Sequence, residues 1–173
     1  MEQKRKKIAV VGLGYVGIPL LASLSRHFDV VGFDVSKKKI ESLYNDDDFN
    51  DIINKDELKK INCRLSSDES ILKEANFFII SVPTPIDSHN NPDLKMVKKA
   101  TGLVGRNMTE GSVVVYESTV YPGVTEEICI PILEQESGLV NLKGFWVGYS
   151  PERMNPGDKV HNEENIVKVV AAQ

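Results

Sequence analysis

Cysteine and histidine are scarce in this sequence of 173 residues, which contains two cysteines and three histidines. Disulfide frameworks and zinc sites need several cysteines or histidines at characteristic spacings. Neither the cysteines, Cys63 and Cys129, nor the histidines, His27, His89 and His161, have such spacings. We therefore expect no metal site and no disulfide, and the reducing cytoplasm is the simplest location for this protein.

Long apolar runs and an excess of positive charge are also lacking. No stretch is long enough to span a bilayer, and the basic start of the chain, residues 4–7, is not followed by a signal-peptide cleavage pattern. The formal net charge is -4 and the pI is about 5.4, whereas a nucleic-acid-binding protein normally has a basic face. We expect no membrane and no nucleic acid among its partners.

One acidic segment resembles a calcium-binding loop. Asp46, Asp48, Asn50 and Glu57 occupy positions one, three, five and twelve of such a loop. The sixth position requires glycine for a sharp turn and here is Asp51. We interpret the segment as a solvated loop.

Short apolar runs of strand type alternate with helical patterns along the whole chain. The expected strands cover 8–11, 30–33, 65–66, 77–82, 113–116 and 145–149, and residues 167–170 are a candidate for one more. The expected helices cover 16–27, 36–44, 68–74, 93–107 and 123–136. Continuous apolar strands that alternate with helices indicate a parallel sheet covered on both faces. The predicted fold is α/β, a single doubly wound, mostly parallel Rossmann-type domain over 1–173.

A glycine-rich turn, GLGYVG at residues 12–17, lies between the first strand and the first helix. In this context Gly12 permits a tight turn, Gly14 allows a pyrophosphate to approach the backbone, and Gly17 allows close packing. The helix N-terminus adds amide donors and a partial positive charge. The pattern predicts a dinucleotide site, and a plain turn before a core helix is the alternative.

Asp34 ends the second strand, 17 residues after Gly17. A carboxylate at this point accepts hydrogen bonds from the adenosine ribose and repels a 2′-phosphate, which favours NAD over NADP. The lysines at 37–39 weaken this inference, because a nearby cation accommodates a phosphate.

Three more segments follow predicted strands and therefore meet the glycine turn at the carboxyl edge of the sheet, where open α/β sheets bind ligands. They are VPTP at 82–85, ESTVYPG at 117–123 and YSPERMNPG at 149–157. Proline- and threonine-rich loops often only end strands, but three on one edge favour a binding site.

Over essentially its whole length the chain resembles the UDP-glucose/GDP-mannose dehydrogenase family. The branch that it resembles most is that of the UDP-N-acetylhexosamine 6-dehydrogenases, by the sequences at residues 83–87, 91–94 and 150–158. Enzymes of this family oxidise the C6 alcohol of a nucleotide sugar to a carboxylate with two NAD, and this branch makes uronic acids for bacterial surface polysaccharides. The resemblance thus implies NAD as cofactor and a UDP-sugar as substrate.

The resemblance also implies roles for individual residues. The pyrophosphate contacts would come from Gly12, Tyr15, Val16 and Gly17. Asp34, with Lys39, would bind the adenosine end, and Thr84 would lie near the nicotinamide ribose. Thr119 matches the threonine that contacts the cofactor side of the site and helps to position the catalytic water. Glu152 matches the glutamate that assists acid/base chemistry and hydrolysis of the covalent intermediate, although a solvated loop acid is the plain alternative.

Two features depart from the full family pattern. Pro156 stands where the UDP-glucose branch has a second glutamate, four positions after the first, which disfavours UDP-glucose as substrate without excluding it. The resemblance implies that the nucleophilic cysteine lies in a central domain beyond residue 173. Neither cysteine of this chain replaces it, since Cys129 has an apolar, core-like setting and Cys63 has no evident activating partner. We therefore expect a truncated chain that binds NAD without turning over substrate, within a longer homo-oligomeric enzyme. A non-catalytic, NAD-binding regulatory module is the remaining alternative.

Overall fold

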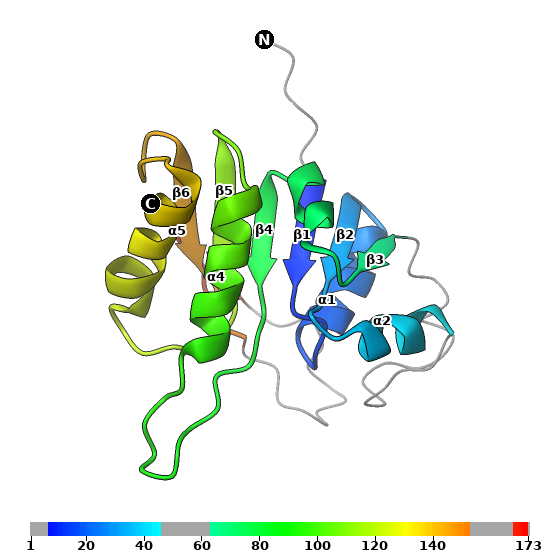
Figure 1. Cartoon of the computed structure of the whole chain (residues 1–173), viewed down its shortest axis with the longest axis horizontal. Coiled ribbons are helices and arrows are strands. Elements are labelled where there is room, and N and C mark those ends of the chain that lie inside the picture. Colours follow the sequence, from blue (N-terminus) through cyan, green and yellow to red (C-terminus); the bar gives the residue numbers. More distant parts are fainter. Residues whose placement is uncertain (1–6, 46–62, 153–167, 173) are drawn as a thin grey trace.

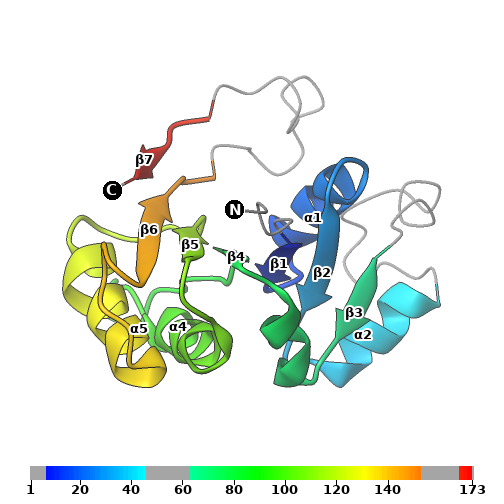
Figure 2. The same ribbon diagram turned by 90° about the horizontal axis from the view of Figure 1, so that it is seen from above.

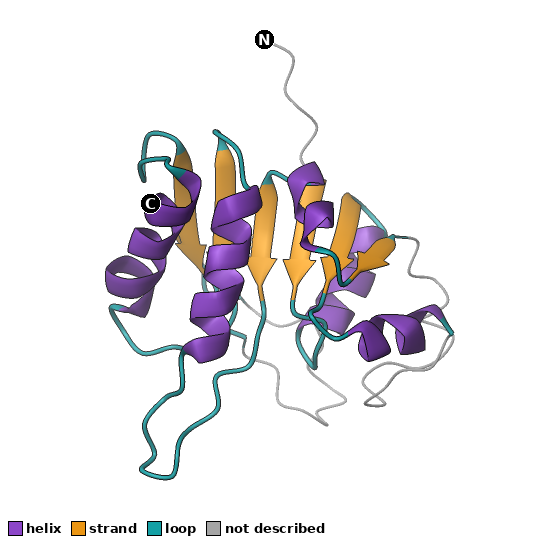
Figure 3. Cartoon of the chain, viewed as in Figure 1, coloured by secondary structure: helices purple, strands orange, loops and turns teal. Residues whose placement is uncertain are grey.

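A seven-stranded sheet forms the centre of the computed structural model, which describes residues 7–45, 63–152 and 168–172. The strand order is β3-β2-β1-β4-β5-β6-β7; Figures 1 and 3 show the strands from β3 to β6, and Figure 2 shows β7 beside β6. The strands are β1 (Lys7–Val11), β2 (Asp29–Phe33), β3 (Arg64–Ser66), β4 (Phe77–Ile80), β5 (Ser112–Tyr116), β6 (Phe145–Tyr149) and β7 (Ala171–Ala172). The helices are α1 (Gly17–Ser25), α2 (Lys37–Tyr44), η1 (Glu69–Glu74), α4 (Lys95–Asn107), η2 (Val124–Cys129) and α5 (Ile130–Ser137).

All neighbouring strands from β3 to β6 pair in parallel, and only β7 pairs antiparallel, with β6. The chain builds outward from β1 to β3 in one direction and then returns to β4 on the other side of β1. The carboxyl ends of β1 and β4 therefore form a topological switch point, where the loops diverge. The doubly wound, mostly parallel sheet expected from the sequence is confirmed.

Two apolar clusters lie on opposite faces of the sheet because alternate residues of each strand point to opposite faces. Ile8 and Val10 pack with α1 and α2, whereas Ala9 and Val11 pack with η1, α4, η2 and α5. Figure 2 shows α1 on one face of the sheet and α4 with α5 on the other. The two-sided burial explains why the strands are continuously apolar.

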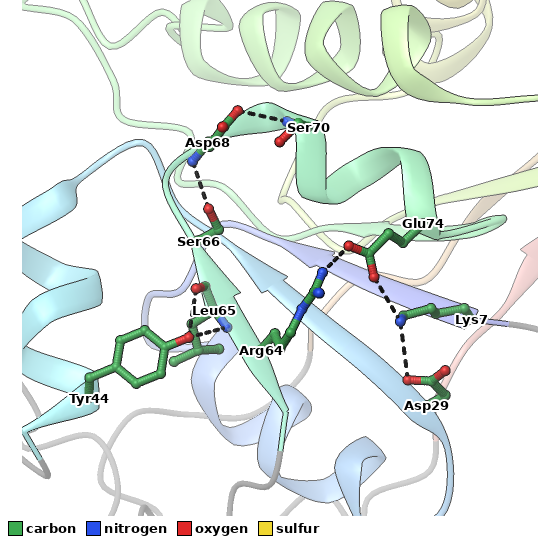
Figure 4. Close-up of polar contacts among 9 residues, drawn as sticks. All are labelled: Lys7, Asp29, Tyr44, Arg64, Leu65, Ser66, Asp68, Ser70 and Glu74. Carbon is green, nitrogen blue, oxygen red and sulfur yellow. Dashed lines mark hydrogen bonds and ion pairs between the residues drawn. The ribbon is translucent and has the colours of Figure 1, made fainter.

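Polar contacts fix the edge of the sheet around β3 (Figure 4). The Tyr44 hydroxyl donates to the Leu65 carbonyl at 2.8 Å and accepts from the Leu65 amide at 3.0 Å, which joins α2 to β3. Glu74 at the end of η1 pairs with Arg64 and with Lys7, which also pairs with Asp29. Since these ion pairs are partly exposed, each contributes about 0–1 kcal/mol.

Three local expectations differ from the structure. The helix expected at 123–136 begins with a π-helical turn, η2, and continues as α5. The helix that Asp68 caps through the Ser70 amide is a 3₁₀ helix of only six residues. Residues 168–170 are not in a strand, and β7 follows them at Ala171–Ala172.

Residues 46–62 and 153–167 lie outside the described part of the chain. The segment with calcium-loop spacing falls in the first range, and Pro156 and His161 fall in the second. Among the described residues no helix is long and apolar enough to cross a membrane, and no group of three or more potential metal ligands occurs.

Candidate functional site

A cleft of about 550 Å³ lies at the carboxyl edge of the sheet, at the switch point between β1 and β4. Residues from both halves of the sheet line it. Those proposed from the sequence are Gly12, Gly14, Tyr15, Val16, Asp34, Lys39, Thr84, Thr119 and Glu152. Gly17 lies behind the glycine turn and is not among the residues that line the cleft. The structure thus brings together predicted site residues that are up to 140 positions apart in the sequence, from Gly12 to Glu152.

The glycine-rich turn has a conformation that requires glycine at two positions. Gly12 has a φ of 96°, which side-chain-bearing residues rarely adopt. A Cβ atom on Gly17 would overlap the Gly12 carbonyl oxygen, and the Ser81 hydroxyl donates a hydrogen bond of 2.8 Å to that same oxygen. The turn is therefore packed tightly against α1 and against the end of β4.

Gly14 has the opposite environment, because a Cβ atom there would have no neighbour within 4 Å. The backbone at Gly14 is thus open on the cleft side, where it is one of the lining residues. The first turn of α1 has no side-chain cap, whereas Ser36 caps α2. Free amide groups and the helix dipole at this position suit a bound anion such as a pyrophosphate.

Asp34 is 7% exposed and its carboxylate connects three segments. Oδ2 accepts from the Leu13 amide at 2.9 Å and lies 2.7 Å from the Lys39 ammonium. Oδ1 accepts from the Ser36 amide at 2.9 Å. A carboxylate has about four acceptor positions, so one remains for a ligand hydroxyl. The adjacent Lys39 offsets the charge of Asp34, which reduces the repulsion of a 2′-phosphate.

Hydroxyl groups join the loops at the other end of the cleft. Thr84 donates to the Thr119 carbonyl at 2.7 Å, and Ser118 donates to the Val82 carbonyl at 2.7 Å. These bonds connect the loop after β4 to the loop after β5. They hold Thr84 and Thr119 at one end of the cleft, opposite the Asp34 end.

A charged group that sequence reasoning missed lies at this same end. Glu117, directly after β5, lies 2.9 Å from the Lys168 ammonium, which is also 3.3 Å from a carboxylate oxygen of Glu152. Burial raises the pKa of Glu117, and Lys168 only partly offsets this effect. Burial alone would lower the pKa of Lys168, but the two carboxylates raise it. Glu117 begins the ESTVYPG segment, so its position was visible in the sequence although its role was not.

Both cysteines lie in settings that keep the thiol protonated. Burial raises the pKa of the Cys63 thiol to about 12. Burial also raises the pKa of the Cys129 thiol, which lies in the core beside Tyr116. Neither cysteine lines the cleft. An activated nucleophile needs a lowered pKa or an adjacent base, so neither thiol suits nucleophilic catalysis.

A comparison with known families agrees with this geometry. Residues 6–172 match the UDP-glucose/GDP-mannose dehydrogenase family, NAD binding domain. The chain belongs to this family. The family resemblance expected from the sequence is therefore confirmed, and with it NAD as the cofactor of this domain.

Two relatives show how much of a family protein the chain represents. It is 52% identical over 168 residues to protein CapL of Staphylococcus aureus, covering 97% of this chain and 40% of the relative. It is 49% identical over 166 residues to a UDP-N-acetyl-D-glucosamine 6-dehydrogenase of Salmonella typhi, covering 95% and 39%. The chain thus spans about 40% of the length of these family members.

A solved structure of the family has the same arrangement of elements. The crystal structure of NDP-N-acetyl-D-galactosaminuronic acid dehydrogenase from Methanosarcina mazei Go1 superposes with a TM-score of 0.86 at 29% sequence identity. The match covers 98% of this chain and 39% of that chain. The fold of this chain is therefore that of the family's dinucleotide-binding portion.

Proposed function

We propose that the chain is the NAD-binding portion of a nucleotide-sugar 6-dehydrogenase that oxidises the C6 alcohol of a UDP-N-acetylhexosamine to a uronic acid. The observation that carries the proposal is the single cleft in which the glycine turn, Asp34, Thr119 and Glu152 meet. Its length along the sheet edge suits an extended ligand that contacts both halves of the sheet.

The residues of the cleft fit NAD. The open backbone at Gly14, with Tyr15 and Val16 at the uncapped start of α1, would hold the pyrophosphate. The remaining acceptor position of Asp34 would take a ribose hydroxyl, and Lys39 would lie beside it. Thr84 would lie beside the nicotinamide ribose. When bound, NAD supplies the acceptor for the hydride that leaves C6.

Thr119 and Glu152 would act at the reacting end of the cleft. Thr84 holds the Thr119 backbone through its carbonyl, and the Thr119 hydroxyl would position a water molecule. Glu152 presents a nearly buried carboxylate with Lys168 3.3 Å away. Such a carboxylate would accept a proton from the alcohol or from the attacking water, which is general base chemistry.

The nucleophile that captures the intermediate aldehyde would lie outside these 173 residues, since neither Cys63 nor Cys129 is suitable. We propose that a longer protein contains it in a further domain, and that this protein is a cytoplasmic homo-oligomer that works on UDP-sugars. The name of the Salmonella typhi relative, at 49% identity, favours UDP-N-acetyl-D-glucosamine as the substrate.

Calorimetric titration of the chain with NAD and, separately, with NADP tests the cofactor part of the proposal. We expect NAD to bind more tightly than NADP. A Lys39→Met variant is the matched probe, because without the cation Asp34 should repel a 2′-phosphate more strongly and the preference for NAD should increase. If neither dinucleotide binds to the chain or to the longer protein, the proposal is wrong.

Assays of the longer enzyme test the substrate. UDP-GlcNAc and UDP-GalNAc should be oxidised in preference to UDP-glucose, and a strong preference for UDP-glucose would contradict this assignment. Thr119→Val and Glu152→Gln should each reduce turnover strongly. If both variants kept full activity, or if no nucleotide sugar were oxidised, a regulatory NAD-binding module would be the better description.

A further inference from the structure

Lys168 lies between two carboxylates that reach it from different strand ends. Its ammonium is 2.9 Å from Glu117 Oε1 and 3.3 Å from Glu152 Oε2. Only 6% of the Glu117 side chain and 9% of the Glu152 side chain are exposed. Attraction between charges is much stronger in such a poorly solvated place than at the surface. The contact is therefore a strong determinant of where these three side chains lie.

The sheet register explains why these residues meet. In the antiparallel pair of β6 and β7, Gly148 is opposite Ala172 and Tyr149 is opposite Ala171. The pairing ends there and residues 168–170 are not in a strand, but the antiparallel course of the chain brings Lys168 to the level of Glu152, which it contacts. On the other side of β6, Tyr116 pairs with Tyr149 in parallel register, which brings Glu117 to the same edge. The arrangement of β5, β6 and β7 thus places all three charged side chains at the same end of the cleft.

The buried position of Glu117 reduces the stability of the folded state. Its Oε2 atom is buried and has no hydrogen-bond partner among the described residues, and a buried carboxylate oxygen without a partner destabilises the folded state. Lys168 is the cation that contacts its other oxygen. An arrangement that destabilises the fold and adjoins a ligand cleft is more typical of a functional site than of a core.

We propose that Lys168 is a positioning residue for Glu152, and that Glu117 anchors Lys168 in place. This inference rests on the proposed function of Glu152. Glu117 holds the ammonium from the β5 side, and the ammonium holds the Glu152 carboxylate in the cleft. The second carboxylate of the site then comes from the end of β5.

Without Lys168, the two carboxylates would lose the cation that they share. Their repulsion would move Glu152 from its position or favour protonation of one carboxyl. A displacement of about 1 Å at a reacting group reduces turnover by up to about 100-fold. Binding of NAD, which depends on the glycine turn and Asp34 at the other end of the cleft, should change little.

Carbon-13 NMR of the glutamate carboxyl groups in the 173-residue chain tests the contact without any substrate. In Lys168→Met, the pKa of Glu117 should rise further, because both the hydrogen bond and the charge of Lys168 lower it. The Glu152 carboxyl resonance should also shift, and Lys168→Arg should restore both signals toward those of the wild type. An unchanged Glu117 titration in Lys168→Met would overturn the proposal.

Kinetics of the longer enzyme test the positioning role. Lys168→Met should reduce kcat by about 10- to 100-fold with little change in the KM for NAD, and Lys168→Arg should recover most of the activity. Lys95→Met is the matched control, since Lys95 is paired with Asp93 on the surface and is 83% exposed. A kcat for Lys168→Met equal to that of the control would also overturn the proposal.

Two further results separate the possible failures. If Lys168→Met does not fold, Glu117→Gln replaces it, and an unshifted Glu152 resonance in that variant would contradict the proposed chain of contacts. If the unaltered longer enzyme oxidises no nucleotide sugar, the proposed function fails. The NMR titration then still decides whether Lys168 holds the two carboxylates.

Discussion

The carboxylate of Asp34 accepts a hydrogen bond of 2.9 Å from the Leu13 amide, which connects the end of β2 to the middle of the glycine-rich turn. Asp34, which is proposed to determine the preference for NAD over NADP, therefore also stabilises the turn that would hold the pyrophosphate. Substitutions at Asp34 should affect folding and binding together, and the two effects have to be measured separately.

Asp34→Ala should reduce the free energy of unfolding by about 3 kcal/mol, because hydrogen bonds to a buried charge are lost and Lys39 loses its partner. Asp34→Asn keeps one acceptor oxygen and should be less destabilising. Urea unfolding measures the stability of both variants, and calorimetry measures NAD binding. If Asp34→Ala unfolds like the wild type, its contact with Leu13 has no structural role.

Gly14→Ala and Gly17→Ala should have opposite effects. A methyl group at Gly14 enters open space, so folding should be nearly unchanged, while NAD affinity should fall by about tenfold or more because the methyl group obstructs the approach of the pyrophosphate. A methyl group at Gly17 overlaps the Gly12 carbonyl, so the free energy of unfolding should fall by about 3 kcal/mol. Thermal unfolding and NAD titration of both variants distinguish these effects. Normal NAD binding by Gly14→Ala would contradict the pyrophosphate position.

Glu117 should make the stability of the chain depend on pH. Because burial raises its pKa in the folded state, the folded chain binds this proton more tightly than the unfolded chain. The resulting stabilisation is fully present below the ordinary glutamate pKa and is lost as the pH rises through the raised pKa. Urea unfolding of the wild type and of Glu117→Gln across this range should show a smaller decrease in the variant. Parallel pH profiles would contradict the raised pKa.

The two thiols should react slowly in the folded chain. Burial raises the pKa of Cys63 to about 12, and only the thiolate form reacts with alkylating reagents. We expect little labelling by iodoacetamide at neutral pH and rapid labelling in urea. NAD binding by Cys63→Ala and by Cys129→Ala should match that of the wild type. Rapid labelling of either folded thiol would reopen the question of the nucleophile.

The strands and the glycine turn could be predicted from the sequence because their signals are local. Continuous apolar runs such as 77–82 indicate buried parallel strands, and Gly12 and Gly17 stand where their φ angle and close packing require glycine. Asp34 could be placed for the same reason, since it directly follows a strand. The family resemblance then added Thr84, Thr119 and Glu152.

The charged group at the far end of the cleft could not be predicted in this way. Lys168 is 51 positions from Glu117, and the antiparallel return of the chain beside β6 brings it there. That antiparallel pairing was missed because the apolar residues at 167–170 were a stronger strand signal than the two alanines that pair. The π-helical turn in η2 was missed because its sequence has ordinary helical character, and a π-turn depends on tertiary packing.

Because the cleft lies at the switch point, a ligand bound there would stabilise both halves of the sheet. The walls of the cleft come from the β1–β2 half and from the β4–β5 half, which meet where β1 pairs with β4. A dinucleotide bound there would oppose separation of the two halves, and at 100 times its dissociation constant it adds about 2.7 kcal/mol to stability. Amide hydrogen exchange should therefore slow in β2 and in β5 alike, although these strands are not neighbours.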